Sequence, residues 1–311
     1  MDVHGGEKVA VSVLASQKGA LAVRHEDLAV LAVTGKDRVS WLNGLLTCDL
    51  VKRAPDAAVY GLAVGRNGRV LADARVVFDE AGERLLVAVP AIVAEALRAH
   101  LDHYLVMEDA TIAPRTDAFV VWELHGPRSG EALLAALAAG ALGGRVDRTG
   151  LGGAMVLAQV DEEREVAAAL AGTATVGDAA AWEAVRLERA VPRFGVDFDD
   201  RTYPQEAGLE KTAVSFDKGC YLGQEVVCML QMRGHVKRKL AALVIEAVAA
   251  PPVGAVVTDP AGASVGEVTS ATTSPTVGKA VALAMLKRAQ AEPGTGVVVG
   301  VARGEVVERP A

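Results

Sequence analysis

The chain has 311 residues, of which 51% are hydrophobic and 23% are charged, so it is long enough for more than one packed domain. Its formal net charge of -7 argues against a protein that mainly coats nucleic acid, because such binding needs clustered lysine and arginine. We therefore expect no direct nucleic-acid partner. The cysteines Cys48, Cys220 and Cys228 are too few and too unevenly placed for a disulfide framework, so reduced thiols are expected.

The start of the chain also narrows the class of protein. Residues 1–8 lack the basic start and apolar core of a signal peptide, and no later apolar run reaches membrane-spanning length. We expect a cytoplasmic protein with no membrane partner. A basic cluster lies at residues 233–239, and its default interpretation is a solvated junction between a helix and a strand.

Apolar patterns predict a series of short elements in the first part of the chain. Residues 28–35 read as a strand, and a helix follows from Asp37 to Leu46. Three more strands, separated by turns that contain glycine, are predicted at residues 59–64, 69–78 and 84–89. We expect these three strands to form an antiparallel meander.

Helical spacing follows the meander. Pro90 predicts the first turn of a helix. The core face of this helix would carry Ile92, Val93, Ala96, Leu97, Leu101 and Tyr104. The alanine-rich run from Ser129 to Leu142 predicts another helix. Further strands are expected at 118–124 and 154–160, and further helices at 163–171 and 179–189. Regular βαβ alternation is lacking, so the predicted fold class is α+β.

The composition of the sequence changes after His235. From Leu240 onward, short valine-rich strands are broken by proline and glycine. This pattern is typical of a small β-barrel or sandwich. We place the boundary between two domains near Lys237.

The segment 216–225, Phe-Asp-Lys-Gly-Cys-Tyr-Leu-Gly-Gln-Glu, has no hydrophobic period and carries the clearest functional signal. Its glycines allow a tight turn and let another group come close to the sulfur of Cys220. Lys218 and the start of a predicted helix would both favour the thiolate. Cys220 is a candidate nucleophile, redox thiol or metal-cluster ligand, and the alternative is a buried inert cysteine.

Asp73 interrupts an apolar strand just after a glycine turn. A carboxylate in that position needs a partner or faces a pocket. Strand alternation places it on the same face as Arg75, so the alternative is a simple ion pair on a wet surface.

Trp182, Arg186 and Arg189 recur at helical spacing, so one helix face offers an aromatic ring and two guanidinium groups. Such a face suits a flat, anionic ligand, whereas the alternative is a surface helix that Trp182 anchors by packing. Glu206 adds a carboxylate, which can accept two hydrogen bonds side by side from a heterocycle. Its alternative role is that of a helix N-terminal charge.

These residues together resemble the YgfZ family, whose members are relatives of the glycine-cleavage T-protein (GcvT). Residues 218–225 match the family motif K-G-C-Y-x-G-Q-E throughout, and T-proteins lack this motif. Weaker support lies in residues 33–42, 68–73 and 186–206, so the resemblance covers nearly the whole chain. It implies a GcvT-like cloverleaf, with a folate-binding region of two interwoven α+β lobes at residues 1–237 and a β-barrel domain at residues 238–311.

The resemblance also implies a function. A central cavity would hold tetrahydrofolate, and the protein would support iron–sulfur cluster assembly or repair, affecting tRNA modification through iron–sulfur enzymes. Folate and iron–sulfur client or assembly proteins are the implied partners. By position, Trp182 and Glu206 resemble folate-contacting residues, and Asp73 matches the catalytic aspartate of the T-protein. A second folate-contacting tryptophan of one branch is replaced by Leu28 here.

Two groups of site residues follow from the motif and the resemblance. The predicted catalytic residues are Cys220, Asp73 and Lys218. The predicted cofactor-binding residues are Trp182, Glu206, Arg186, Tyr221 and Gln224. No resident metal is expected, although Cys220 is a candidate transient ligand of a cluster.

Alternative functions remain open at this point. One is a tetrahydrofolate-dependent aminomethyltransferase, in which Asp73 orients or deprotonates the folate nitrogen that attacks an aminomethyl donor. Another is a binding module in which folate only stabilises the fold. The sequence therefore leaves open whether the protein is an enzyme.

Overall fold

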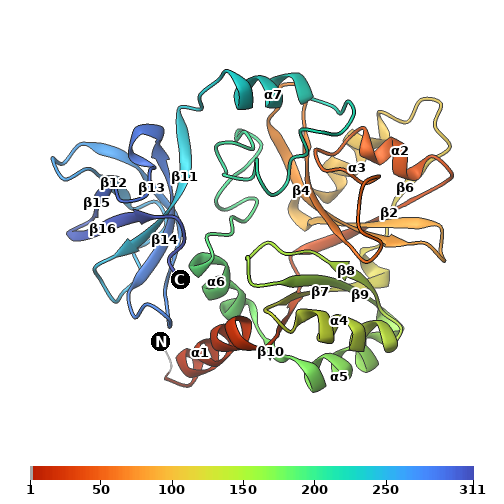
Figure 1. Cartoon of the computed structure of the whole chain (residues 1–311), viewed down its shortest axis with the longest axis horizontal. Helices are drawn as coiled ribbons and strands as arrows, with labels where there is room; N and C mark the ends of the chain where they lie inside the picture. Colours follow the sequence, from red (N-terminus) through yellow and green to blue (C-terminus); the bar gives the residue numbers. More distant parts are fainter. Residues whose placement is uncertain (1–2) are drawn as a thin grey trace.

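The structure is a computed structural model that describes residues 3–311. It contains two five-stranded sheets and a closed six-stranded barrel. In Figure 1 the barrel lies at the left and the two sheets lie at the right. Helix α6 and the long segment that leads to α7 run between them. Among the described residues, no helix is both long and apolar enough to span a bilayer.

The first sheet contains the predicted meander. Its strands in spatial order are β3 (Val59–Val64), β4 (Val70–Asp79), β5 (Arg84–Pro90), β2 (Leu28–Thr34) and β6 (Thr111–Pro114). Strands β3, β4 and β5 pair antiparallel in chain order, so the predicted meander is confirmed. Strand β2 pairs with β5 and β6, and this places an earlier segment of the chain beside the end of the meander.

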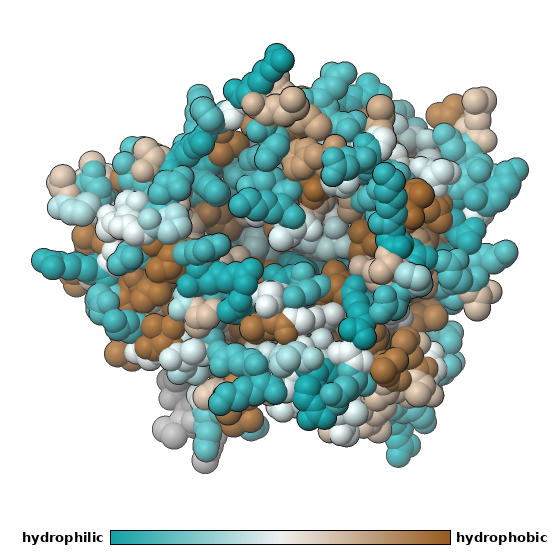
Figure 2. Space-filling view, viewed as in Figure 1, coloured by the Kyte–Doolittle hydropathy of each residue, from teal (hydrophilic) through white to brown (hydrophobic). Residues whose placement is uncertain are grey.

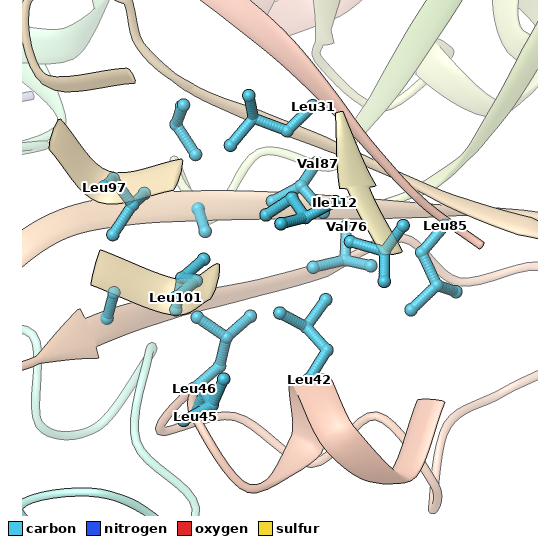
Figure 3. Packing of buried hydrophobic residues seen from close by; sticks show 14 of the residues in the cluster. Leu31, Leu42, Leu45, Leu46, Val76, Leu85, Val87, Leu97, Leu101 and Ile112 are labelled. Atoms are coloured by element: carbon cyan, nitrogen blue, oxygen red, sulfur yellow. The ribbon is translucent and has the colours of Figure 1, made fainter. Parts of the chain in front are cut away.

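Two helices, α2 (Arg38–Asn43) and α3 (Ala94–Asp102), cover one face of the first sheet. Figure 3 shows Leu42 of α2 and Leu101 of α3 directed at sheet residues such as Val76. All three side chains are at most 2% exposed, so the helices are held by apolar burial.

The helix that was predicted to begin at Pro90 starts later. Pro90 is the last residue of β5 and pairs with Leu28, and a 3₁₀ turn, η1 (Ala91–Val93), precedes α3. Because of this delay, Leu97 is buried as expected, whereas Ile92 is 75% exposed and Ala96 is exposed. The strand pairing overrides the helix-start signal of proline.

The second sheet was predicted only in part. Its strands in spatial order are β10 (Thr175–Gly177), β1 (Leu21–His25), β7 (Phe119–His125), β9 (Gly153–Gln159) and β8 (Leu142–Arg145). The outer face is covered by α4 (Ser129–Ala138) and α5 (Glu163–Thr173), and 3₁₀ turns η2 (Thr116–Ala118) and η3 (Val160–Glu162) flank β7 and β9. Helix α4 was predicted to reach Leu142, but it ends at Ala138 because Gly140 takes a positive φ of 97° and Leu142 opens β8.

The two sheets pack face to face. Apolar residues of the first sheet, such as Val30 and Ala88, meet residues of the second, such as Val121 and Leu157, in one buried cluster. Strands β1 and β2 follow one another in the chain but belong to different sheets, so the two lobes are interwoven. Polar groups at this interface are therefore shielded from water on both sides.

The barrel and its contacts complete the fold. Its strands in spatial order are β11 (Arg238–Ile245), β14 (Ala280–Lys287), β13 (Ser264–Thr273), β12 (Val256–Thr258), β15 (Gly296–Val299) and β16 (Ala302–Val307), with η4 (Arg288–Gln290) after β14. The expectation of a small C-terminal barrel is confirmed. Helix α6 (Ala179–Glu188) packs Leu187 on Leu240 of the barrel, and α1 (Val3–Lys18) packs on α6. Helix α7 (Gln224–Met232) precedes the barrel directly.

Candidate functional site

A narrow pocket opens where the two sheets meet α6 and the segment after it. The pocket is lined by His25, Asp27, Leu28, Asp73, Arg75, Pro90, Arg148, Trp182, Arg186, Pro192, Arg193 and Phe194. Its cavity volume is about 30 Å³. The viewed face of the molecule is hollowed near its centre, between the barrel and the sheets (Figure 2). The structure thus brings Asp73, Trp182 and Arg186 to one pocket.

Asp73 lies on β4 at the inner face and is only 2% exposed. Its Oδ2 accepts a hydrogen bond of 3.1 Å from the hydroxyl of Tyr60. The same oxygen lies 3.1 Å from Nη1 of Arg75 and 3.7 Å from Nη2 of Arg148. The expected pairing with Arg75 is confirmed, but the expectation of a wet surface is wrong, because the second sheet covers this face.

Glu123 of β7 faces the same charges from the opposite sheet. Nε of Arg75 donates to its Oε1 at 2.7 Å, and Nη1 of Arg148 lies 3.5 Å from that oxygen. Burial alone would raise the pKa of Glu123, but the charges of Arg75, His25 and Arg148 hold it well below the usual range. Glu123 is therefore an ionised carboxylate that joins the two sheets.

Trp182 of α6 is fixed between two imidazoles. Its ring stacks on His125 with centroids 4.4 Å apart, and His25 meets it edge-on at 5.9 Å. Burial lowers the pKa of His125 to about 4, so this ring is neutral at pH 7. Burial opposes the charge on His25 as well, but Glu123 and Asp27 outweigh that effect and raise the pKa of His25.

Four residues around the pocket were not predicted from the sequence, namely Glu123, Arg148, His25 and His125. Glu123 interrupts the apolar run of β7 in the way that Asp73 interrupts β4, and that signal was available. His25 and His125 end two strands that are neighbours in the sheet, but their proximity depends on the pairing of β1 with β7. The pairing register of two strands that are far apart in the sequence could not be predicted from the local sequence pattern.

The guanidinium groups of Arg186 and Arg189 both bind protein acceptors. Arg186 is fully buried and binds Glu183, Asp197 at 2.8 Å and the carbonyl of Val191. Arg189 donates to the carbonyls of Thr149 and Ala311. Protein acceptors thus occupy several donors of both arginines, and a contact of either residue with a flat ligand stays a prediction.

Glu206 does not line the pocket. Its Oε2 accepts from the backbone N–H of Tyr203 at 3.0 Å, and its Oε1 accepts from Nε of Arg238 at 3.2 Å. The side chain therefore closes a turn and links that turn to the first strand of the barrel. Of the other predicted cofactor contacts, Tyr221 is buried and Gln224 is the half-buried first residue of α7, and neither lines the pocket.

Lys218 holds the loop that precedes β3. Its Nζ donates to the carbonyls of Asn43, Leu46 and Cys48, the latter two at 2.9 and 2.6 Å. Burial lowers the pKa of Lys218, and three carbonyl oxygens surround the ammonium. Its hydrogen bonds go to this loop and not to Cys220, so the structure gives no support to direct activation of the thiol by Lys218.

Gly223 docks the motif on the hairpin between β3 and β4. It has a φ of 76°, and a Cβ at this position would lie 2.3 Å from the carbonyl oxygen of Gly65. Tyr221 is buried nearby, and burial together with Cys228 raises the pKa of its phenol. The motif residues on either side of Cys220 thus have packing roles.

Cys220 is exposed, unlike the buried Cys48. It precedes the first residue of α7 by four positions, so it lies outside the first helical turn. Within residues 3–311 no group of three or more His, Cys, Asp or Glu side chains is arranged to hold a metal ion. The loop therefore presents a single thiol to solvent.

Comparison with known proteins identifies both parts of the chain. The GCVT N-terminal domain matches residues 8–142, and the glycine cleavage T-protein C-terminal barrel domain matches residues 238–311. The structure is similar to the glycine cleavage system aminomethyltransferase T from Bartonella henselae, with a TM-score of 0.82 and 21% identity over 97% of this chain and 89% of that one. The chain therefore has the GcvT-like fold, with a GCVT N-terminal domain and a C-terminal barrel of the glycine cleavage T-protein type.

Relatives with two different names lie at similar distance. An aminomethyltransferase of Rippkaea orientalis is 29% identical over 90% of this chain and 82% of its own. The tRNA-modifying protein YgfZ of Yersinia pseudotuberculosis is 26% identical over 74% of this chain and 72% of its own. The comparisons therefore support the GcvT-like fold, whereas the two names of the relatives divide on function.

We expect Gly223→Ala to lower the free energy of unfolding by about 1–3 kcal/mol or more, because the left-handed backbone and the Gly65 carbonyl both oppose a Cβ. Gly219→Ala is the control, since open space surrounds that position. It should change stability by less than about 0.5 kcal/mol. Urea unfolding of both variants measures this, and equal losses would contradict the packing role of Gly223.

His125 should make stability fall as the pH drops. Its folded pKa of about 4 lies below the ordinary 6.5, so the unfolded chain binds the proton more readily between these values. We expect a loss of roughly 2 kcal/mol between pH 7 and pH 5. His25, whose pKa is raised, acts in the opposite direction, because its folded state binds the proton more readily than the unfolded chain until both are fully protonated.

The matched variants are His125→Phe, which keeps a ring against Trp182, and His235→Gln, which changes an exposed imidazole. Urea unfolding at pH 7, 6 and 5 should show a flatter dependence for the first variant only. An unchanged slope in His125→Phe would exclude a neutral, buried His125.

Proposed function

We propose that the chain is a folate-binding accessory protein of the YgfZ type, which supports the assembly or repair of iron–sulfur proteins through the thiol of Cys220. One observation carries the proposal: an exposed cysteine stands in a loop that Lys218 and Gly223 fix by backbone contacts. A loop fixed in this way presents the thiol at low entropic cost, which suits contact with another macromolecule. An effect on tRNA modification would then be indirect, through iron–sulfur enzymes.

The pocket beside Asp73 suits the ring of a folate in its chemistry. Nε of Arg148 and Nε of Arg193 are buried without a hydrogen-bond partner among the described residues, whereas Nη1 of Arg75 is paired with Asp73. Buried donors of this kind favour a ligand with acceptor atoms. Leu28, Pro90, Trp182 and Phe194 supply apolar walls for a flat ring. Because the open space is small, these walls must move apart when a ring enters.

Each residue of the pocket then has a role. Trp182, held by His125, would pack on the flat ring, and Nε of Arg148 would meet one of its acceptor atoms. No described residue donates a hydrogen bond to Oδ1 of Asp73, so that oxygen is available to accept an N–H. Bound tetrahydrofolate supplies a nucleophilic nitrogen and a carrier for one-carbon units.

We expect Cys220→Ala to abolish the rescue of iron–sulfur enzyme activity in a strain that lacks this protein. The fold should be unaffected, because the side chain is exposed and Gly219 beside it has open space around it. Cys228→Ala is the matched control, since that thiol is half-buried on α7. Full rescue by Cys220→Ala, at equal protein level, would contradict a functional thiol.

A second candidate is a tetrahydrofolate-dependent aminomethyltransferase. The observation in its favour is the buried Asp73, which stands in the pocket and keeps one carboxylate oxygen free. Such a carboxylate is suited to orient a folate nitrogen or to accept its proton.

The second candidate is tested by incubating the purified protein with aminomethylated carrier protein and tetrahydrofolate. Transfer would release ammonia and form methylene-tetrahydrofolate, and Asp73→Asn should then slow it by about 10²-fold or more. If neither product appears, aminomethyl transfer is excluded and the accessory role stands alone. Release of both products at rates that Asp73→Asn leaves unchanged would exclude the role of Asp73.

A further inference from the structure

Helix α7 exposes apolar side chains near Cys220. Met229 is 55% exposed and Met232 is 76% exposed, and they share one helix face because they are three residues apart. The opposite side of the helix is anchored by Val227, which is fully buried, and Val226 on the flank meets Gly68 of the β3–β4 hairpin. At the top of Figure 2, over α7, apolar atoms lie among hydrophilic ones.

Positive charge continues this face beyond the end of the helix. Arg233, His235 and Lys237 are exposed. No described carboxylate forms an ion pair with Arg233 or Lys237, whereas Arg238 is paired with Glu206. The sequence has no acidic residue between Glu225 and Glu246, although the whole chain carries a net charge of -7. We define the α7 patch as Met229, Met232, Arg233, His235 and Lys237.

The composition of the α7 patch points to a protein partner more than to RNA. Nucleic acid is bound by basic grooves with aromatic side chains on which bases stack, and the α7 patch has no Phe, Tyr or Trp side chain. Flexible, exposed methionines fit apolar side chains on another protein. The unpaired cations of the α7 patch attract an acidic protein surface. The rest of the chain repels such a surface, because the net charge of the chain is negative.

We propose that the α7 patch docks an acidic protein surface that carries apolar side chains, and that this places the partner beside Cys220. The inference rests on the proposed function in one respect, since the partner would be the protein that Cys220 serves. The nine residues of α7 span about 14 Å along the helix axis. One interface of modest size can therefore cover both the α7 patch and the Cys220 loop.

The test replaces Met232 with the photo-cross-linking residue benzoylphenylalanine in the full chain, in cells. Val301, which is fully exposed on the barrel, carries the same residue in the control. We expect one acidic protein, identified by mass spectrometry, to cross-link at position 232 and not at position 301. Purified, it should bind this chain in dilute salt and bind about tenfold more weakly at about 0.5 M salt.

Charge reversal supplies the matched variants. Arg233→Glu with Lys237→Glu should reduce both the cross-link and the binding by about tenfold or more. Arg164→Glu with Arg303→Glu changes the net charge equally at exposed residues of α5 and β16, and it should leave both unchanged. The proposal would be overturned if no specific cross-linked product formed, if ribonuclease removed the product, or if the product were a second copy of this chain. It would also be overturned if Arg233→Glu with Lys237→Glu left the cross-link and the binding unchanged.

The two proposals fail separately. If Cys220→Ala retains full rescue but the acidic partner still binds through the α7 patch, the proposed thiol function is wrong and the docking surface stands. If Cys220→Ala abolishes rescue but Arg233→Glu with Lys237→Glu rescues fully, the thiol function stands and the docking surface is wrong.

Discussion

The buried charge network between the two sheets constrains everything else in the molecule. Asp73 and Glu123 come from opposite sheets, and Arg75 and Arg148 lie between them. Removing one member would leave an uncompensated charge at an interface that apolar side chains seal on both sides, at a cost of about 3–5 kcal/mol. The network therefore fixes the relative position of the sheets, and with it the pocket that Trp182 closes.

The loop around Cys220 is held in a different way, by contacts with backbone atoms. There the polar residues are used to hold backbone, since Lys218 binds three carbonyls and Gly223 permits contact with the hairpin. The thiol itself makes no such contact and faces solvent. Gly68 in the turn of that hairpin precedes Asp73 of β4 by five residues, at most roughly 16 Å at 3.3 Å per residue. The motif and the pocket are thus joined by one strand but face different surroundings.

Local pattern predicted those parts of the fold that depend on neighbours in the chain. The meander, the C-terminal barrel and the interruption of β4 by Asp73 were all readable from alternation and turn residues. Strand pairing at Pro90 and the positive φ of Gly140 overrode helical spacing, because tertiary contacts outweigh propensity.

The site was harder to predict because it is assembled from segments far apart in sequence. Arg186 was expected to face a ligand, yet Asp197 and Glu183 neutralise it. His125 was overlooked, although it fixes Trp182, since their contact joins a strand and a helix more than 50 residues apart. Glu206 matched a family pattern by position, but its partner Arg238 turns it toward the barrel.

The central claim is that the pocket walled by Trp182 holds a folate. Native mass spectrometry of protein purified without oxygen, before and after addition of tetrahydrofolate, measures this directly. The account predicts one folate per chain in the wild-type protein and its loss in Trp182→Ala. A wild-type protein that carries no folate under either condition, or a Trp182→Ala variant that retains it equally, would contradict the account.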